Sequence, residues 1–216
     1  MKFEGVIFDL DGTLVDSLED IADSMNSVLQ GCGFPSHDLR SYKRFIGNGI
    51  KNLVSEALPE TFRTEELIDK CYNFMVEKYR YNFVNKTRPY DGIAEMLTEL
   101  TARKIILTVF SNKADELTKK VVKALLPSWK FEAIIGSSND IPRKPNPFGA
   151  LLISRQLSIA PENLIYVGDS DLDMQTANSA GMYAVGALWG YRTKEELVSN
   201  GAQYLLYRPL DLIKLL

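Results

Sequence analysis

The fold of this 216-residue chain is decided by the stretch Val6-Ile7-Phe8-Asp9-Leu10-Asp11-Gly12-Thr13-Leu14. Its first three residues are β-branched or aromatic, and such a short apolar run predicts a buried strand. The turn-forming residues Asp11-Gly12-Thr13 then end that strand. We therefore expect a core strand near the N-terminus that presents two carboxylates, Asp9 and Asp11, at its carboxyl end.

Beyond residue 86, apolar strands alternate with helices. We expect strands at residues 105–110, 131–135, 164–167 and 183–186. We expect helices at residues 93–102, 115–125, 148–157 and 174–180, and a short strand followed by a terminal helix within 202–216. Because these strands are apolar throughout, the pattern predicts a parallel sheet that helices cover on both faces.

Residues 15–86 show only helical spacing of apolar residues. We expect helices at 17–29, 39–46, 49–58 and 65–81, with no strand among them. The predicted fold class is therefore α/β, with an all-helical domain inserted after the first strand. We place the catalytic core at residues 1–14 and 87–216, and the helical domain at residues 15–86.

Composition excludes several classes of protein. The net charge of −3 shows no basic footprint for nucleic acid. The N-terminus lacks the pattern of a signal peptide, and no apolar run reaches the roughly 20 residues that span a bilayer. Cys32 and Cys71 are expected to be free thiols, and a lone histidine, His37, argues against a His-based triad. We expect a cytoplasmic monomer or homodimer with no nucleic-acid or membrane partner.

Three polar clusters each follow an expected strand. They are Asp9-Leu10-Asp11-Gly12-Thr13, Ser111-Asn112-Lys113 and Gly168-Asp169-Ser170-Asp171-Leu172-Asp173. In open α/β sheets, ligands bind at the carboxyl ends of the strands, so parallel strands would bring the clusters to one edge. Lys144 lies in a short loop beyond the strand at 131–135 and is expected to reach that edge.

The chemistry of such an edge follows from its carboxylates. Carboxylates that are brought together repel one another, and oxygen ligands without histidine or cysteine favour Mg²⁺. Lys144 would balance further negative charge, and the Ser111 hydroxyl would bind phosphate oxygens. Asp9 can attack phosphorus and form an aspartyl-phosphate. Asp11, two residues on, can protonate the leaving oxygen and then activate water.

These motifs resemble those of the haloacid dehalogenase superfamily. Asp9-Leu10-Asp11-Gly12-Thr13-Leu14 is similar to its first motif, while Ser111, Lys144 and Gly168–Asp173 match the second, third and fourth motifs in order. The resemblance implies a Rossmann-like core. It also implies that the inserted helical domain is a cap over the substrate. Family dehalogenases lack the second carboxylate, so Asp11 indicates phosphoryl transfer.

The resemblance also implies a role for each residue. Asp9 would be the nucleophile and a metal ligand, and Asp11 the general acid and base, with its backbone carbonyl on the metal. Thr13 would stabilise the loop at the substrate, and Ser111 and Asn112 would hold the phosphoryl group. Lys144 would neutralise charge on Asp9 and the phosphate. Asp169 would ligate Mg²⁺, and Asp173 would ligate the ion or orient its waters.

The segment from Lys43 to Leu53 looks like the cap segment of phosphoglycolate phosphatases. Backbone N–H groups of Gly47-Asn48-Gly49, at a helix start, would meet a substrate carboxylate. Arg44 and Lys51 would add positive charge there. In the alternative interpretation, both cations are solvated helix charges and the glycines merely end and begin helices. The favoured small phosphorylated metabolite is 2-phosphoglycolate.

Other functions use the same core. A pyrophosphatase, a sugar-phosphate phosphatase and a mutase share these motifs. From another class, a non-catalytic phospho-acceptor regulatory module also combines an acidic cluster, an acceptor Asp and a Lys. Such modules lack an equivalent of Asp11 and the helical insert, which favours the enzyme. Lys113 stays open between a site residue and a surface charge.

Overall fold

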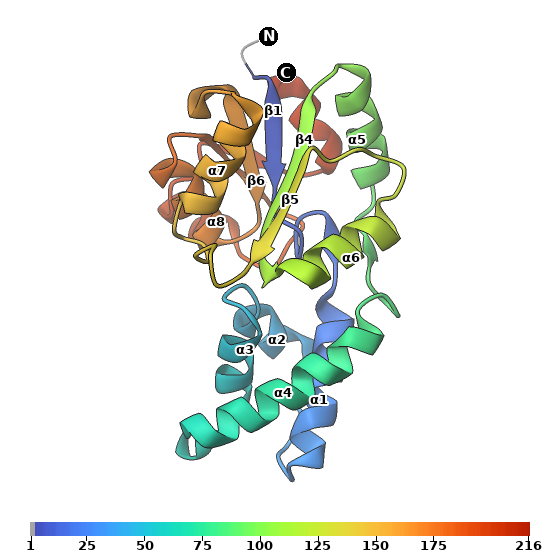
Figure 1. The fold of residues 1–216 in the computed structure, drawn as a ribbon, viewed down its shortest axis with the longest axis vertical. Coiled ribbons are helices and arrows are strands. Elements are labelled where there is room, and N and C mark those ends of the chain that lie inside the picture. The colour runs from blue at the N-terminus through green and yellow to red at the C-terminus, as the bar shows by residue number, and fades with distance from the viewer. Residues whose placement is uncertain (1–2) are drawn as a thin grey trace. The chain divides into compact units, whose positions relative to one another are not determined.

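The computed structural model describes residues 3–216, and its core is a six-stranded parallel sheet (Figure 1). The strand order is β5-β4-β1-β6-β7-β8. The strands are β1 (Gly5–Phe8), β4 (Ile106–Ala114), β5 (Ala133–Ser137), β6 (Leu164–Gly168), β7 (Tyr183–Ala187) and β8 (Tyr204–Leu206). The central strand is β1, and its residue Phe8 pairs with Val109 of β4 and Val167 of β6. This register aligns the carboxyl ends of the three strands that carry the polar clusters.

Helices cover both faces of this sheet. Figure 1 shows α5 (Ile93–Ala102) and α6 (Asp115–Leu125) on one face, and α7 (Phe148–Leu157) and α8 (Asp171–Ser179) on the other. The short elements η2 (Pro161–Asn163), α9 (Lys194–Ser199) and η3 (Pro209–Leu215) complete the core. Val6, Ile7 and Phe8 are fully buried, as a strand covered on both sides requires. The predicted α/β fold class is confirmed.

The chain forms two compact units, Met1–Asp16 with Pro89–Leu216, and Ser17–Arg88. The second unit contains α1 (Leu18–Gly31), α2 (Leu39–Phe45), α3 (Ile50–Ala57), η1 (Glu60–Phe62) and α4 (Glu65–Asn82). In it, α4 packs against α1 and α3, and Met25, Cys71, Met75 and Tyr79 are fully or almost fully buried. No helix among the described residues has both the length and the apolar character needed to cross a membrane.

A buried carboxylate holds the base of this helical unit. Asp20, in the first turn of α1, accepts hydrogen bonds from the backbone N–H groups of Lys86 and Thr87 and from the Thr87 hydroxyl, at 2.7–3.0 Å. Four short bonds to one carboxylate fix the end of the unit against its beginning. The unit therefore has a defined base although its two ends are far apart in the sequence.

Several elements differ from the expectations. Two short strands, β2 (Val15–Asp16) and β3 (Arg88–Pro89), form a separate two-stranded sheet. Two-residue strands are too short for the alternation that identifies a strand in a sequence. The six-residue α9 was not expected, and η3 is a 3-10 helix where a terminal helix was expected. Strand β4 continues to Ala114 after a register shift, so Ser111 to Lys113 lie within it.

Candidate active site

Three buried carboxylates meet at the carboxyl edge of the sheet. Asp9 follows β1, Asp169 follows β6 and Asp173 lies in the first turn of α8. One oxygen of each lies within 4.8 Å of the others. Ser170 positions the third carboxylate, because its side chain caps α8 and donates a 2.6 Å hydrogen bond to Asp173 Oδ2.

Lys144 is the cation of this cluster. Its Nζ lies 2.8 Å from Asp9 Oδ1 and 2.7 Å from Asp173 Oδ1, and its side chain is only 3% exposed. Asn112 holds the lysine by its backbone. The Asn112 Oδ1 accepts a 2.8 Å bond from Lys144 N, and its Nδ2 donates a 3.3 Å bond to Lys144 O. The contact therefore joins the expected second and third motifs.

Burial and charge shift the ionisation of the cluster. Burial raises the pKa of Asp9 to about 8, against the attraction of Lys144 and with the repulsion of Asp173 and Asp169. Burial, together with the charge of Asp173, raises the pKa of Asp169 to about 7. Burial would lower the pKa of Lys144, but the charges of Asp173 and Asp9 hold it well above its usual value.

The cluster has the properties of a site for a hard divalent cation. One ammonium group contacts two of the three carboxylates, and the three lie close enough to repel one another when ionised, so a cation bound among them would relieve that repulsion. Asp9 Oδ1 is buried and lies 2.8 Å from the Lys144 ammonium group. Carboxylate oxygens are ligands that suit Mg²⁺.

Asp11 lies outside this cluster and pairs with a different cation. The Lys113 Nζ lies 2.8 Å from Asp11 Oδ1 and 2.7 Å from Asp11 Oδ2. The lysine side chain is 3% exposed and the aspartate side chain 13%. The structure thus decides the open question about Lys113, which is a buried residue of the site. The sequence pattern could not decide it, because the orientation of Lys113 depends on the register shift in β4.

Thr13 and Ser111 are both buried at this edge. The Thr13 hydroxyl donates a 3.1 Å hydrogen bond to Asp169 Oδ1, which ties the loop after β1 to the loop after β6. The Ser111 Oγ accepts a 3.3 Å bond from Lys113 N. The contact of either residue with a phosphoryl group stays a prediction.

A loop that was not predicted from the sequence as part of the site contacts the same edge of the sheet. It follows β7, where Trp189 Nε1 donates a 2.9 Å bond to Thr13 O and Tyr191 N donates a 2.8 Å bond to Asp169 Oδ2. A side chain at Gly190 would clash with Asp169 and with the Gly12 carbonyl. The position of this loop at the carboxyl end of a parallel strand was the signal that could have identified it.

The four predicted cap residues lie in the helical unit. Arg44 is exposed in the last turn of α2, and Gly47 and Asn48 lie between α2 and α3. Lys51, in the first turn of α3, forms a surface ion pair with Asp69 at 2.6 Å, and both side chains are about half exposed. Gly47 has a φ of 125°, a conformation that favours glycine. Their role in recognising a carboxylate stays a prediction.

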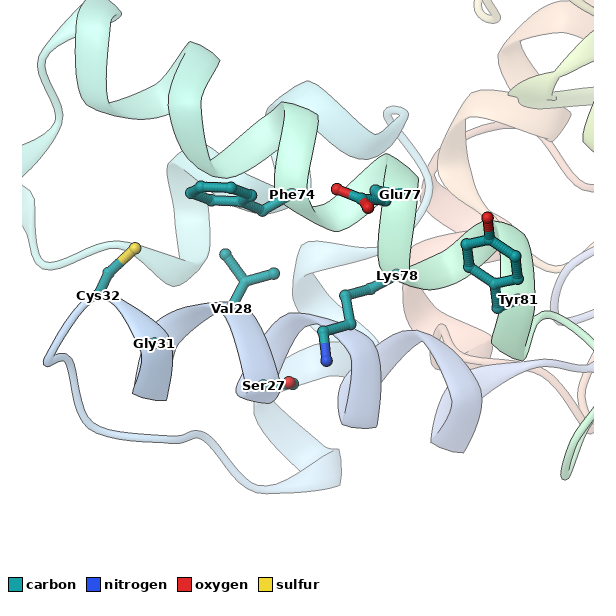
Figure 2. Close-up of a pocket in the computed structure, with 8 residues that line it drawn as sticks. All are labelled: Ser27, Val28, Gly31, Cys32, Phe74, Glu77, Lys78 and Tyr81. Atoms are coloured by element: carbon teal, nitrogen blue, oxygen red, sulfur yellow. The ribbon is translucent and has the colours of Figure 1, made fainter.

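A groove of about 620 Å³ lies elsewhere in the helical unit (Figure 2). Its lining comes from the end of α1 and from α4: Ser27, Val28, Gly31, Cys32, Phe74, Glu77, Lys78 and Tyr81. Cys32 and Cys71 are free thiols, as expected, and their Sγ atoms lie 3.7 Å apart. Among residues 3–216, the acidic cluster suited to a metal is the one at the sheet edge, so the candidate active site lies there rather than in this groove.

Comparisons with known proteins agree with this geometry. Residues 6–187 match the family model of the haloacid dehalogenase-like hydrolases. The phosphoglycolate phosphatase of Aquifex aeolicus is 35% identical over 98% of this chain and 95% of its own length. The phosphoglycolate phosphatase of Chromobacterium violaceum is 31% identical over 98% of this chain and 96% of its own length.

Comparison with solved structures also indicates this family. The crystal structure of a predicted phosphoglycolate phosphatase from Haemophilus somnus 129PT superposes with a TM-score of 0.92 at 28% identity, covering 100% of this chain and 98% of that one. The match extends over both the sheet core and the helical unit. The resemblance drawn from the four motifs is confirmed, and the chain belongs to the haloacid dehalogenase-like hydrolases.

Proposed function

We propose that this hydrolase is a Mg²⁺-dependent phosphatase of a small phosphorylated metabolite, with Asp9 as the nucleophile and 2-phosphoglycolate as the substrate. The observation that carries the reaction is the environment of Asp9. This buried carboxylate lies between Lys144 and Asp169, and a second carboxylate, Asp11, follows two residues later. The names of the Aquifex and Chromobacterium relatives support the choice of substrate.

Asp9, Asp169 and the backbone carbonyl of Asp11 would hold the metal. Asp173 Oδ1 accepts a hydrogen bond from Lys144, and Asp173 Oδ2 accepts hydrogen bonds from Ser170. We assign this carboxylate to ligating the ion or to orienting its waters beside Lys144. When bound, Mg²⁺ would supply positive charge to the cluster and to a substrate phosphate oxygen. Thr13 and the Tyr191 N–H hold Asp169 in place from either side.

The reaction then runs in two steps on this chain's own residues. In the first, an Asp9 oxygen attacks phosphorus, the bond to the leaving oxygen breaks, and Asp11 gives that oxygen a proton. In the second, Asp11 takes a proton from water, the water oxygen attacks the phosphorus of the aspartyl-phosphate, and phosphate leaves Asp9. Lys144 balances the charge on Asp9, and the Ser111 hydroxyl donates to a phosphoryl oxygen.

The helical unit would select the substrate. We assign the backbone N–H groups of Gly47, Asn48 and Gly49 and the side chains of Arg44 and Lys51 to the carboxylate of 2-phosphoglycolate. Gly49 is the N-cap residue of α3, and backbone N–H groups at a helix start can bind an anion. Lys51 would exchange its exposed contact with Asp69 for the substrate, at little cost because such surface pairs are weak.

The test is a screen of phosphate esters with and without Mg²⁺, including 2-phosphoglycolate, pyrophosphate, hexose phosphates and nucleotides. We expect phosphate release that requires Mg²⁺ and is fastest with 2-phosphoglycolate. If phosphate is released fastest from another ester, the protein would still be a phosphatase, and that ester would replace 2-phosphoglycolate as the proposed substrate. If the folded protein releases no phosphate from any ester but takes up one phosphoryl group from acetyl phosphate, it is the regulatory phospho-acceptor instead.

A further inference from the structure

We infer that Lys113 is a positioning residue that aims the carboxyl group of Asp11 at the reacting oxygen. The inference rests on the proposed function, in which Asp11 moves a proton in both steps. It concerns a buried lysine whose ammonium group contacts both carboxylate oxygens of Asp11, so we expect its effect on the reaction to pass through Asp11.

The Lys113 ammonium group lies between the two oxygens of Asp11. Lys113 Nζ contacts both oxygens of Asp11, at 2.8 and 2.7 Å. An ammonium placed between the two oxygens of a carboxylate limits rotation of that carboxylate about its side-chain bonds. The Lys113 side chain is 3% exposed and the Asp11 side chain is 13% exposed, so water competes little for either partner.

The backbone of Lys113 is held by hydrogen bonds on both sides. Lys113 N donates to Ser111 Oγ at 3.3 Å, and Lys113 O accepts a 3.1 Å bond from the Thr118 hydroxyl of α6. Gly136 of β5 approaches so closely that a side chain there would clash with Lys113 O. A lysine with a fixed backbone and a buried stem offers its ammonium group at one place, whereas an exposed lysine samples many.

Burial of the Lys113–Asp11 pair requires both charged groups to lose water. A buried ion pair is not a general means of stabilising a fold, because desolvation of both charges offsets much of their attraction. The chain has exposed lysine–aspartate pairs of the same length, such as Lys119 with Asp115 at 2.7 Å. The Lys113 pair is instead buried at the catalytic edge, where proton transfer would require the carboxyl group within about 3 Å of the reacting oxygen.

A double-mutant cycle on the full chain with Mg²⁺ tests the inference. The substrate is 2-phosphoglycolate, together with any ester that the screen shows to be hydrolysed faster. We expect Lys113→Met to lower kcat by roughly 10–100-fold and to change KM by less than about threefold, as expected for loss of a group that assists proton transfer. In an Asp11→Asn background, the same change should lower kcat by less than about threefold, because two residues that act through one another are not additive.

Lys119→Met is the matched control, since it breaks an exposed pair of the same length and should keep kcat within about twofold of the wild type. Equal falls in kcat in both backgrounds, or a rise in KM without a fall in kcat, would overturn the inference and make Lys113 a substrate contact. Should Lys113→Met fail to fold, Lys113→Gln replaces it with the same criteria. A wild type without turnover overturns the proposed function and this inference together, whereas an active wild type with additive variants overturns this inference alone.

Discussion

Lys144 of the core and Lys51 of the helical unit differ in how far they are exposed to solvent. In the core, Lys144 is 3% exposed and contacts two buried carboxylates. In the helical unit, Lys51 is 48% exposed and pairs with Asp69, which is 50% exposed. Breaking a buried pair by removing one partner costs about 3–5 kcal/mol, whereas an exposed pair contributes about 0–1 kcal/mol. Lys144 is therefore held in one place by its buried partners, whereas Lys51 can exchange Asp69 for another partner at little cost.

The largest expected effect comes from the nucleophile. We expect Asp9→Asn to lower turnover by at least about 10⁴-fold, as is typical when a nucleophile is lost. The fold should persist, because the change removes one of three mutually repelling carboxylates. Phosphate release measures the first effect, and intact-protein mass should show no phosphoryl adduct. A variant with near-normal turnover would exclude Asp9 as the nucleophile.

Removal of the buried cation tests the comparison between the two units directly. In Mg²⁺-free buffer, Lys144→Met should lower the free energy of unfolding by about 3–5 kcal/mol, because it leaves Asp9 and Asp173 buried without their cation. The matched variant, Lys51→Met, should change it by less than about 1 kcal/mol. Urea unfolding of both variants gives the two values. Similar values for both would remove the distinction between the units.

The pH dependence of stability tests the same burial without mutation. Burial raises the folded-state pKa of Asp169 to about 7 and that of Asp9 to about 8, from an ordinary value of 3.8. Between pH 4 and 8 the unfolded chain therefore binds fewer protons than the folded one, and stability falls as pH rises. We expect a loss on the order of 6 kcal/mol between pH 5 and 8 without metal, because each proton that only the folded chain holds contributes about 1.4 kcal/mol per pH unit.

Magnesium should oppose this loss. A divalent cation replaces protons at the carboxylates, so its affinity should rise with pH across the same window. Thermal unfolding at several pH values, with and without Mg²⁺, measures how stability changes with pH in each state. Stability that rises with pH in the metal-free protein would contradict the raised pKa values. The same pH dependence of stability with and without Mg²⁺ would argue against binding at this cluster.

The acidic cluster could be anticipated from the sequence, because it depends on topology alone. Apolar strands predicted a parallel sheet, and parallel strands bring Asp9 and Asp169 to one edge whatever the details of the loops. The contacts of Lys113 and Trp189 could not be anticipated in this way. The first depends on a register shift inside β4, and the second on a loop that reaches Thr13 from 176 residues away. Such contacts are set by tertiary packing, which leaves no periodic signal in the sequence.

The smallest expected effect lies in the helical unit and decides what its exposed charges do. If Arg44 and Lys51 bind the substrate carboxylate, replacing either with alanine should raise KM for 2-phosphoglycolate by roughly 5–30-fold, the range expected for about 1–2 kcal/mol of an ion contact. The KM for a neutral aryl phosphate should stay within about twofold, because that ester has no carboxylate to lose. Glu56→Ala is the control, since it removes another partly exposed charge of α3. Equal effects on both esters would make Arg44 and Lys51 ordinary solvated helix charges. Recognition of the carboxylate would then have to come from the backbone N–H groups around Gly49, whose conformation, with a φ of 84°, a side chain would strain.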